Sequence, residues 1–218
     1  MSDLYGEQHR VIQSMFDTEN LANAVKSNIV ADEFSDEHRG FIETRDMFFL
    51  TTVDHRGYPT CSYKGGSPGF VRVVDSKTLV FPSYDGNGMF LSLGNILSNS
   101  KVGMLFMDFE TPHRIRVHGT AKIDTKSELS GSFPGSEAII TLTLTEVFIN
   151  CPRYIHQYKR IKSSKYIPQA GCKTPLAQWK RIDNLQEFLP ARDKHIAESS
   201  GGTITSEEYV ELVIRGEA

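Results

Sequence analysis

The sequence lacks several features that would place it at once in a functional class. It has no run of about 18 apolar residues, the minimum for a membrane-spanning helix. Its first residues, MSDLYGEQHR, lack the charged and then apolar pattern of a secretory signal. The 3 cysteines include no CxxC pair, which argues against a zinc framework and suits a reduced compartment. We therefore expect a cytoplasmic protein without a membrane anchor.

An excess of positive charge is also missing. Lys and Arg number 24 against 27 Asp and Glu, which gives a net charge of −3. This balance argues against a broad nucleic-acid surface and leaves only a local basic pocket open. The chain has no HExxH, His-x-His or carboxylate cluster with the spacing of metal ligands, so no metal site is expected. Its 218 residues, 39% of them hydrophobic, are enough to bury a core without a metal or a disulfide.

Turn residues separate short apolar runs through the middle of the chain. These runs predict about seven strands, mostly with short connections and with a single obvious helix among them. Closely spaced strands of this kind favour an antiparallel barrel or sandwich over βαβ units. The expected strands cover residues 47–54, 60–64, 70–75, 78–83, 101–109, 114–123 and 138–150.

The segments on either side of the strands have a different character. Residues 1–40 are polar with helical spacing, and Thr18 marks a helix entry. Beyond residue 151 the pattern weakens, with one helix expected in 179–190 and another beginning at Thr205. We expect a mainly β single domain over residues 1–218, with a core at about 40–155, an N-terminal helical extension at 1–40 and a C-terminal decoration at 151–218.

The stretch SYDGNGMFLSLGNI, residues 83–96, joins a strand to a small-residue loop and then to a helix. The free N–H groups and the positive dipole end of such a helix start attract phosphate. A dinucleotide fingerprint fails because Leu91 stands where a third glycine is required, and no GKS or GKT follows to make a P-loop. From the loop alone, Gly86 and Gly88 are equally consistent with a plain turn.

Basic residues on two strands favour the phosphate interpretation. Lys64 and Ser62 are two residues apart and share one face of a strand, and Arg114 and Arg116 share a face of another. On an exposed face such residues are usually solvated. Inside a small barrel or at a subunit interface, however, arginines need an anionic partner, and the guanidinium fork suits phosphate.

These motifs together resemble a known family. Their order is similar to that of the pyridoxamine 5'-phosphate oxidase-related, FMN-binding split-barrel proteins, over about residues 40–155. The resemblance implies an antiparallel barrel of six or seven strands that forms a homodimer, with one FMN in each of two clefts at the interface. The motifs are FIETRDMFFLTTVDHRGYPTCSYKGG, PGFVRV, TLVFPSYDGNGMFLSLGNI, KVGMLFMDF, RIRVHGTA and CPRYI.

The resemblance also implies which residues hold the FMN. In the family, the second strand and the loop and helix after the fourth strand hold the phosphate, and a later strand adds contacts. The Arg-Lys pair and the C-terminal substrate tail of true pyridoxamine phosphate oxidases are not matched, so activity on pyridoxamine phosphate is not implied. The residues implied are Ser62, Tyr63, Lys64, Ser83, Asn87, Gly88, Met89, Arg114 and Arg116.

We therefore expect an FMN-dependent oxidoreductase that transfers two electrons to or from a small molecule. No catalytic residue is identified, and no residue is a convincing general base. The alternatives are a non-catalytic flavin carrier or sensor, and the same fold with deazaflavin or haem. Arg153 could lower the pKa of the Cys151 thiol, but a structural role is favoured for Cys151, as it is for Cys61. Trp179 could stack on a flavin, but a core or interface position is favoured.

Overall fold

The computed structural model describes residues 3–218, and the chain there forms two compact units. The first unit ends at Ile161 and contains all the strands, and the second is Lys162–Ala218. The expectation of a single domain over residues 1–218, with 151–218 as a decoration of the barrel, stays a prediction. Residues 1 and 2 of the expected N-terminal extension lie outside the described part of the chain.

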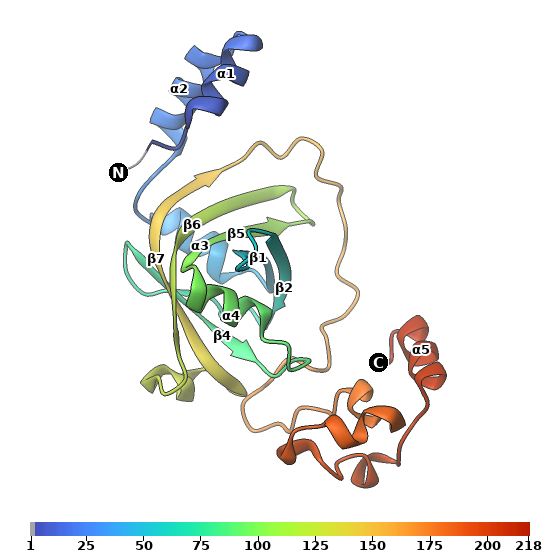
Figure 1. Cartoon of the computed structure of the whole chain (residues 1–218). Helices are drawn as coiled ribbons and strands as arrows, with labels where there is room; N and C mark the ends of the chain where they lie inside the picture. Colours follow the sequence, from blue (N-terminus) through green and yellow to red (C-terminus); the bar gives the residue numbers. More distant parts are fainter. Residues whose placement is uncertain (1–2) are drawn as a thin grey trace. The chain divides into compact units, whose positions relative to one another are not determined.

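The first unit is built on a seven-stranded sheet in which every neighbouring pair is antiparallel. The strand order is β2-β1-β5-β6-β7-β4-β3. The mainly β fold with flanking helices is therefore confirmed, and the arrangement is consistent with a split barrel (Figure 1). The expected strand at 70–75 is shorter than predicted. The strands are β1 (Met47–Val53), β2 (Pro59–Gly65), β3 (Arg72–Val73), β4 (Thr78–Tyr84), β5 (Lys101–Asp108), β6 (His113–Asp124) and β7 (Ser136–Ile149).

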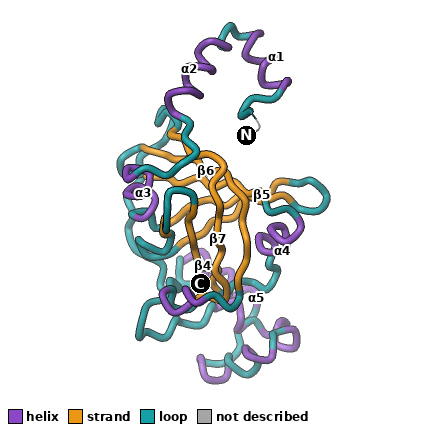
Figure 2. The backbone as a smooth tube through the Cα atoms, turned by 90° about the vertical axis from the view of Figure 1, so that its left-hand side faces the viewer, coloured by secondary structure: helices purple, strands orange, loops and turns teal. Residues whose placement is uncertain are grey.

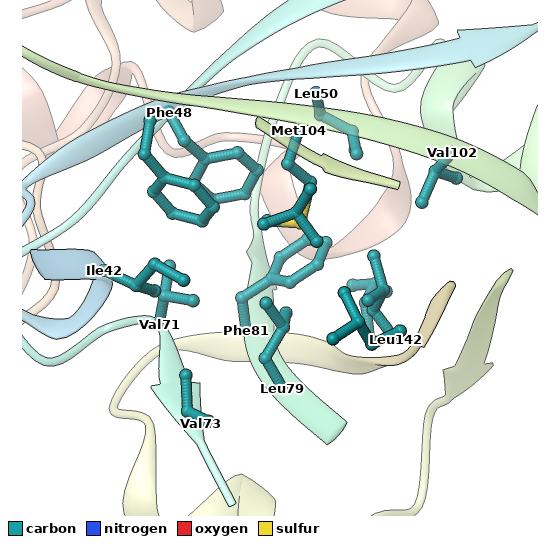
Figure 3. Packing of buried hydrophobic residues seen from close by; sticks show 14 of the residues in the cluster. Ile42, Phe48, Leu50, Val71, Val73, Leu79, Phe81, Val102, Met104 and Leu142 are labelled. Atoms are coloured by element: carbon teal, nitrogen blue, oxygen red, sulfur yellow. The ribbon is translucent and has the colours of Figure 1, made fainter. Parts of the chain in front are cut away.

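Alternate residues of the strands point into one hydrophobic core inside the curved sheet. Phe48 of β1 and Ile115 of β6 are both fully buried. The ring centroid of Phe48 lies 5.1 Å from that of Phe81, and both residues are labelled in Figure 3. It lies 5.2 Å from the ring centroid of Phe106. Burying each large side chain of this kind contributes about 1.5–3 kcal/mol. Since side chains alternate along a strand, the residues between the core positions face the outside of the sheet.

The bend of β6 depends on a glycine. The register between β6 and β7 shifts between His118 and Gly119, which marks a bulge. A Cβ atom on residue 119 would lie 2.3 Å from the carbonyl oxygen of Thr143. Only glycine allows β6 and β7 to approach this closely, so the two long strands can curve together around the core.

Helices flank the sheet, and one of them, α4, lies between β4 and β5 in the chain. Thr18 is the N-cap of the second helix, as the sequence predicts. Figure 2 shows α3 and α4 on opposite sides of the strands, and α4 packs on β1 and β6. Among residues 3–218, no helix has the length and apolar character needed to cross a membrane. The helices of this unit are α1 (Glu7–Met15), α2 (Glu19–Ile29), α3 (Asp36–Glu43), α4 (Leu91–Ser98) and the 3₁₀ helix η1 (Glu128–Ser132).

The second unit contains one α-helix and a series of 3₁₀ turns. The α-helix begins where predicted, because the Thr205 side chain accepts from the N–H of Glu208 and the Glu208 carboxylate accepts from that of Thr205. The helix expected in 179–190 is instead two 3₁₀ turns. The Gln186 side chain binds the carbonyls of Lys180 and Ile182, which would otherwise accept α-helical bonds. The elements are η2 (Gln178–Arg181), η3 (Asp183–Phe188), η4 (Ala191–Asp193), η5 (Glu198–Ser200) and α5 (Ser206–Arg215).

Candidate cofactor site

Helix α4 is held against the inner face of β2 by hydrogen bonds between side chains. Ser62 Oγ on β2 lies 3.1 Å from Ser92 Oγ in the first turn of α4. One turn later, Asn95 Nδ2 donates to Thr60 Oγ1 at 3.0 Å. The helix therefore runs along β2 from Ser62 towards Thr60. Its N-terminal end points the other way, towards Lys64, the next residue on the same face of the strand.

Lys64 is a half-buried cation with no anionic partner. Its side chain makes no hydrogen bond or ion pair with any residue in the described part of the chain. Burial lowers the pKa of its ammonium group, because the charged form loses part of its hydration. An unpaired ammonium group in such a position gains from a bound anion. The structure therefore places Lys64 two residues beyond Ser62 on the same face of β2, on the side of Ser62 from which α4 begins.

The loop before α4 turns through two backbone positions with positive φ. Gly88 has φ = 78° and Phe90 has φ = 48°, and the N–H of Met89 donates to Asn87 Oδ1 at 3.1 Å. The helix begins at Leu91, so Met89 belongs to the loop and Phe90 is the N-cap residue. The N-cap residue of α4 is Phe90, whose side chain makes no capping hydrogen bond, so the N–H groups of the first turn can donate to an anion.

The remaining residue expected at the phosphate lies at the start of this loop. Ser83 is next to the last residue of β4 and is paired with Ala138 of β7. It lies on the same face of β4 as the core residues Leu79 and Phe81. Ser83 and the loop residues 87–89 are therefore all close to the end of β4.

The two arginines expected to share the phosphate site lie on the other face of the sheet. Ile115 and Val117 of β6 are fully buried, so Arg114 and Arg116 between and beside them face outward. Arg116 lies over the ring of Phe148, 5.7 Å from its centroid. Arg114 Nε is buried and is hydrogen-bonded to no atom of residues 3–218.

The expected site residues thus form two groups within one chain. Tyr63 alternates with Ser62 and Lys64 on β2, is 64% exposed, and joins the two arginines on the outer face. The group on the side of α4 consists of Ser62, Lys64, Ser83, Asn87, Gly88 and Met89. The group on the outer face consists of Tyr63, Arg114 and Arg116.

A histidine–carboxylate pair on the outer face was not found from the sequence. His118 Nδ1 of β6 is hydrogen-bonded to Glu146 Oε1 of β7 at 2.8 Å, and the His118 ring lies edge-on to Phe148. The pair orients the imidazole and leaves Nε2 for another partner. The two residues are far apart in the sequence, and only the β6–β7 register, with its bulge, shows that they meet.

Cys151 follows β7 and is exposed. Hydrogen bonds from Arg153, first from its backbone and then from its side chain, lower the pKa of the Cys151 thiol. Arg153 Nε lies 3.3 Å from Cys151 Sγ. The effect that the sequence suggested for a neighbouring arginine is therefore present. Among residues 3–218, no group of three His, Cys, Asp or Glu residues is arranged to hold a metal ion.

A family model described as pyridoxamine 5'-phosphate oxidase matches residues 34–151. The chain belongs to this family. The match begins just before α3 and ends just after β7, so it includes the whole sheet and α4. The resemblance seen in the sequence at about residues 40–155 is therefore confirmed for the family. Both groups of expected site residues lie within the matched part.

Several solved structures are similar to this member of the pyridoxamine 5'-phosphate oxidase family. HupZ of Group A Streptococcus is 21% identical with a TM-score of 0.45, and the match covers 58% of this chain and 99% of HupZ. General stress protein 26 of Bacillus anthracis is 16% identical with a TM-score of 0.40, covering 50% of this chain and 88% of that protein. HutZ, the heme storage protein of Vibrio cholerae, is 19% identical with a TM-score of 0.39, covering 52% and 92%. No curated protein matches the sequence.

Proposed function

We propose that this member of the pyridoxamine 5'-phosphate oxidase family binds FMN and transfers two electrons between it and a small molecule. When bound, FMN supplies the electron transfer, and the protein supplies binding, orientation and electrostatics.

The observation that carries the proposal is the place of Lys64 beside the start of α4. A phosphate monoester near neutral pH carries between one and two negative charges and several acceptor oxygens. Lys64 offers an unpaired ammonium, and α4 offers N–H groups and the positive end of its dipole. The Ser62 and Ser92 hydroxyls lie next to both. These residues fit the phosphate end of FMN.

We further propose that the protein is a homodimer and that the outer face of the sheet takes part in its interface. Arg114 and Arg116 lie there without a carboxylate partner in the described chain. Phe49 and Tyr63, whose rings contact each other, lie on the same face of the sheet. An interface at this face would allow the arginines of one chain to complete the cofactor site of the other. In that arrangement, each site combines one group from each chain, although the sheet separates the two groups within a single chain.

The side chains of the site favour a hydride or two-electron transfer that needs no strong general base. Lys64 can balance negative charge at the phosphate, and an arginine can stabilise negative charge on a reduced ring. His118 is the residue best placed to exchange a proton, because Glu146 fixes its orientation. The expected cytoplasmic location would keep Cys61, Cys151 and Cys172 reduced.

Extraction of the cofactor from freshly purified protein, followed by mass spectrometry, tests the proposal. We expect a yellow protein that releases FMN and is bleached by NADH or NADPH. Yellow protein that no donor reduces would indicate a flavin carrier or sensor instead. A deazaflavin or haem in the extract would contradict the FMN assignment and leave only the fold.

A further inference from the structure

A closed triangle of hydrogen bonds lies between α4 and the sheet. Asn95 Nδ2 donates to Thr52 Oγ1 of β1 and to Thr60 Oγ1 of β2, each at 3.0 Å. The two hydroxyl oxygens lie 2.8 Å apart. Asn95 is 7% exposed and Thr52 is 1% exposed. Water therefore does not replace these bonds, and each of the three groups depends on the other two.

The triangle of hydrogen bonds fixes the position of α4 along its own axis, which the apolar contacts of the helix do not do. Ile96 is buried in the main core and Leu93 packs against the same core, which holds the helix to the sheet. Apolar contact is non-directional, so it resists separation much more than it resists sliding or rotation of the helix. Hydrogen bonds weaken steeply when their angle or length changes. The triangle therefore fixes the position of α4 along its own axis.

This axial position decides where the start of the helix lies. Asn95 and Ser92 are three residues apart and lie on the same face of α4. Asn95 binds opposite Thr60, and Ser92 then meets Ser62 at 3.1 Å, one step closer to Lys64. A small shift of the helix would move the first-turn N–H groups relative to Lys64, with which they would share the proposed phosphate.

We infer that Asn95 is a positioning residue which, through Thr52 and Thr60, fixes the first turn of α4 beside Lys64 and so makes the site selective for a phosphate monoester. The inference rests on the proposed function for the identity of the phosphate ligand. It applies to the phosphate end of that ligand alone, because the uncharged remainder does not use the N–H groups of α4.

Asn95→Leu, which keeps the size of the side chain and removes its two donors, tests the inference. Dissociation constants for FMN and riboflavin are measured for the purified apoprotein. The dissociation constant for riboflavin divided by that for FMN reports the preference for the phosphate. We expect the ratio to fall by about tenfold or more, equal to 1.4 kcal/mol per factor of ten, with riboflavin binding nearly unchanged. Leu97→Ala, on the exposed side of the same helix, is the control and should keep the parent ratio.

A second variant separates positioning from stability. The triple change Asn95→Leu, Thr52→Val and Thr60→Val replaces the whole triangle with apolar groups of similar shape, which can be nearly neutral for stability. We expect its melting temperature to return towards that of the parent while the preference for FMN stays low. An unchanged ratio in Asn95→Leu would overturn the inference. So would a triple variant that regains the preference together with the stability.

A flavin-free readout distinguishes failure of this inference from failure of the proposed function. Inorganic phosphate is titrated into ¹⁵N-labelled apoprotein, and the amide signals of Leu91, Ser92 and Leu93 are followed. We expect these signals to shift in the parent and to shift much less in Asn95→Leu. A parent that responds to phosphate but does not prefer FMN over riboflavin contradicts the proposed function and leaves the inference standing. A parent whose amides do not respond overturns the inference.

Discussion

Lys64 and Arg116 lie on opposite faces of the same sheet. Lys64 is paired with Phe48, whose side chain is buried in the core, and shares its face of the sheet. Arg116 is paired with Leu105 and lies over Phe148 on the outside. The backbone of the sheet separates the two cations, so within one chain they do not meet at one phosphate. Each face of the sheet can therefore be altered by itself.

Placing a negative charge in the loop before α4 should strongly weaken the binding of FMN through its phosphate. In Gly88→Asp the carboxylate would stand beside the proposed phosphate. At an effective dielectric constant of about 20, two unit charges about 4 Å apart repel by roughly 4 kcal/mol. We expect FMN affinity to fall by roughly a thousandfold, since each 1.4 kcal/mol is about tenfold. Riboflavin, which lacks the phosphate, should lose far less, and titration of both ligands measures the difference.

Gly88→Asn is the matched control for that change. Gly88 has φ = 78°, a region that asparagine tolerates better than most residues, and a Cβ atom there meets no other atom within 4 Å. Asparagine has the size of aspartate without its charge. It should therefore retain most of the FMN affinity. Equal losses in the two variants would mean that the loop is sensitive to its backbone conformation and does not hold a phosphate.

Lys64→Met should weaken FMN and spare riboflavin. Methionine keeps most of the length of the side chain but removes the charge. A hydrogen bond to a charged group contributes about 1.5–3 kcal/mol, which corresponds to roughly 10- to 100-fold in affinity. Lys122→Met, on an exposed position of β6, is the control and should leave both affinities unchanged. Similar FMN binding by parent and Lys64→Met would remove Lys64 from the site.

The lowered pKa of Lys64 also predicts how the stability of the apoprotein depends on pH. The unfolded chain binds the proton with the ordinary pKa of 10.5, and the folded chain releases it at a lower pH. Between these two values the unfolded state binds more protons, so the unfolding free energy rises with pH. We expect the parent to gain stability relative to Lys64→Met as pH rises through this window towards 10.5.

Urea unfolding of both apoproteins at a series of alkaline pH values measures this difference. The contribution of Lys64 should be least favourable below the lowered pKa, where the folded state must bury a charged ammonium. Bound FMN should flatten the difference, because the phosphate stabilises the charged form. A constant difference between parent and variant across the whole series would show that the Lys64 pKa is not lowered.

Much of the fold could be predicted from local pattern, because strand alternation and helix caps are local properties. The spacing of Ser62 and Lys64, and that of Arg114 and Arg116, correctly predicted that each pair shares a face. Which of the two faces each pair occupies could not be predicted. That depends on which neighbours are buried, and so on the pairing of strands far apart in the chain.

The hydrogen-bonded pairs could not be predicted from the sequence either, because they too depend on the pairing of segments far apart in the chain. Asn95 meets Thr52 because α4 packs on β1. His118 meets Glu146 because of the β6–β7 register, which includes the bulge at Gly119. The register of that bulge decides which residues of β7 face His118. The start of the helix at Thr205, by contrast, depends only on residues three apart, and the helix begins where the sequence predicts.

Cys151 should react faster than the other two cysteines without having a role in flavin binding. All three thiols are exposed, and hydrogen bonds from Arg153 lower the pKa of the Cys151 thiol. Brief treatment with iodoacetamide below the ordinary thiol pKa, followed by peptide mass spectrometry, should label Cys151 first. Arg153→Met should slow this labelling. Cys151→Ser should keep its flavin and its turnover, and a complete loss of turnover with normal flavin would indicate a nucleophilic role.

Each FMN site should be built from residues of two chains. We expect a homodimer by light scattering, and a monodisperse monomer that holds FMN would contradict it. Lys64→Met damages the group beside α4, and the double change Arg114→Met with Arg116→Met damages the outer face. Each variant alone should bind FMN weakly. If the arginines serve the partner chain, a heterodimer of the two variants contains one site with every group intact.

Mixing the two variants in equal amounts, with unfolding and refolding to exchange chains, should restore tight FMN binding. Random pairing makes half of the dimers heterodimers, so about one quarter of all sites should regain the parent affinity, as expected for a two-fold symmetric dimer. Each variant refolded alone is the control and should regain nothing. If the mixture also regains nothing, Lys64 and the arginines do not cooperate across the dimer. The arginines would then have another role on the outer face, because the sheet separates them from Lys64 within their own chain.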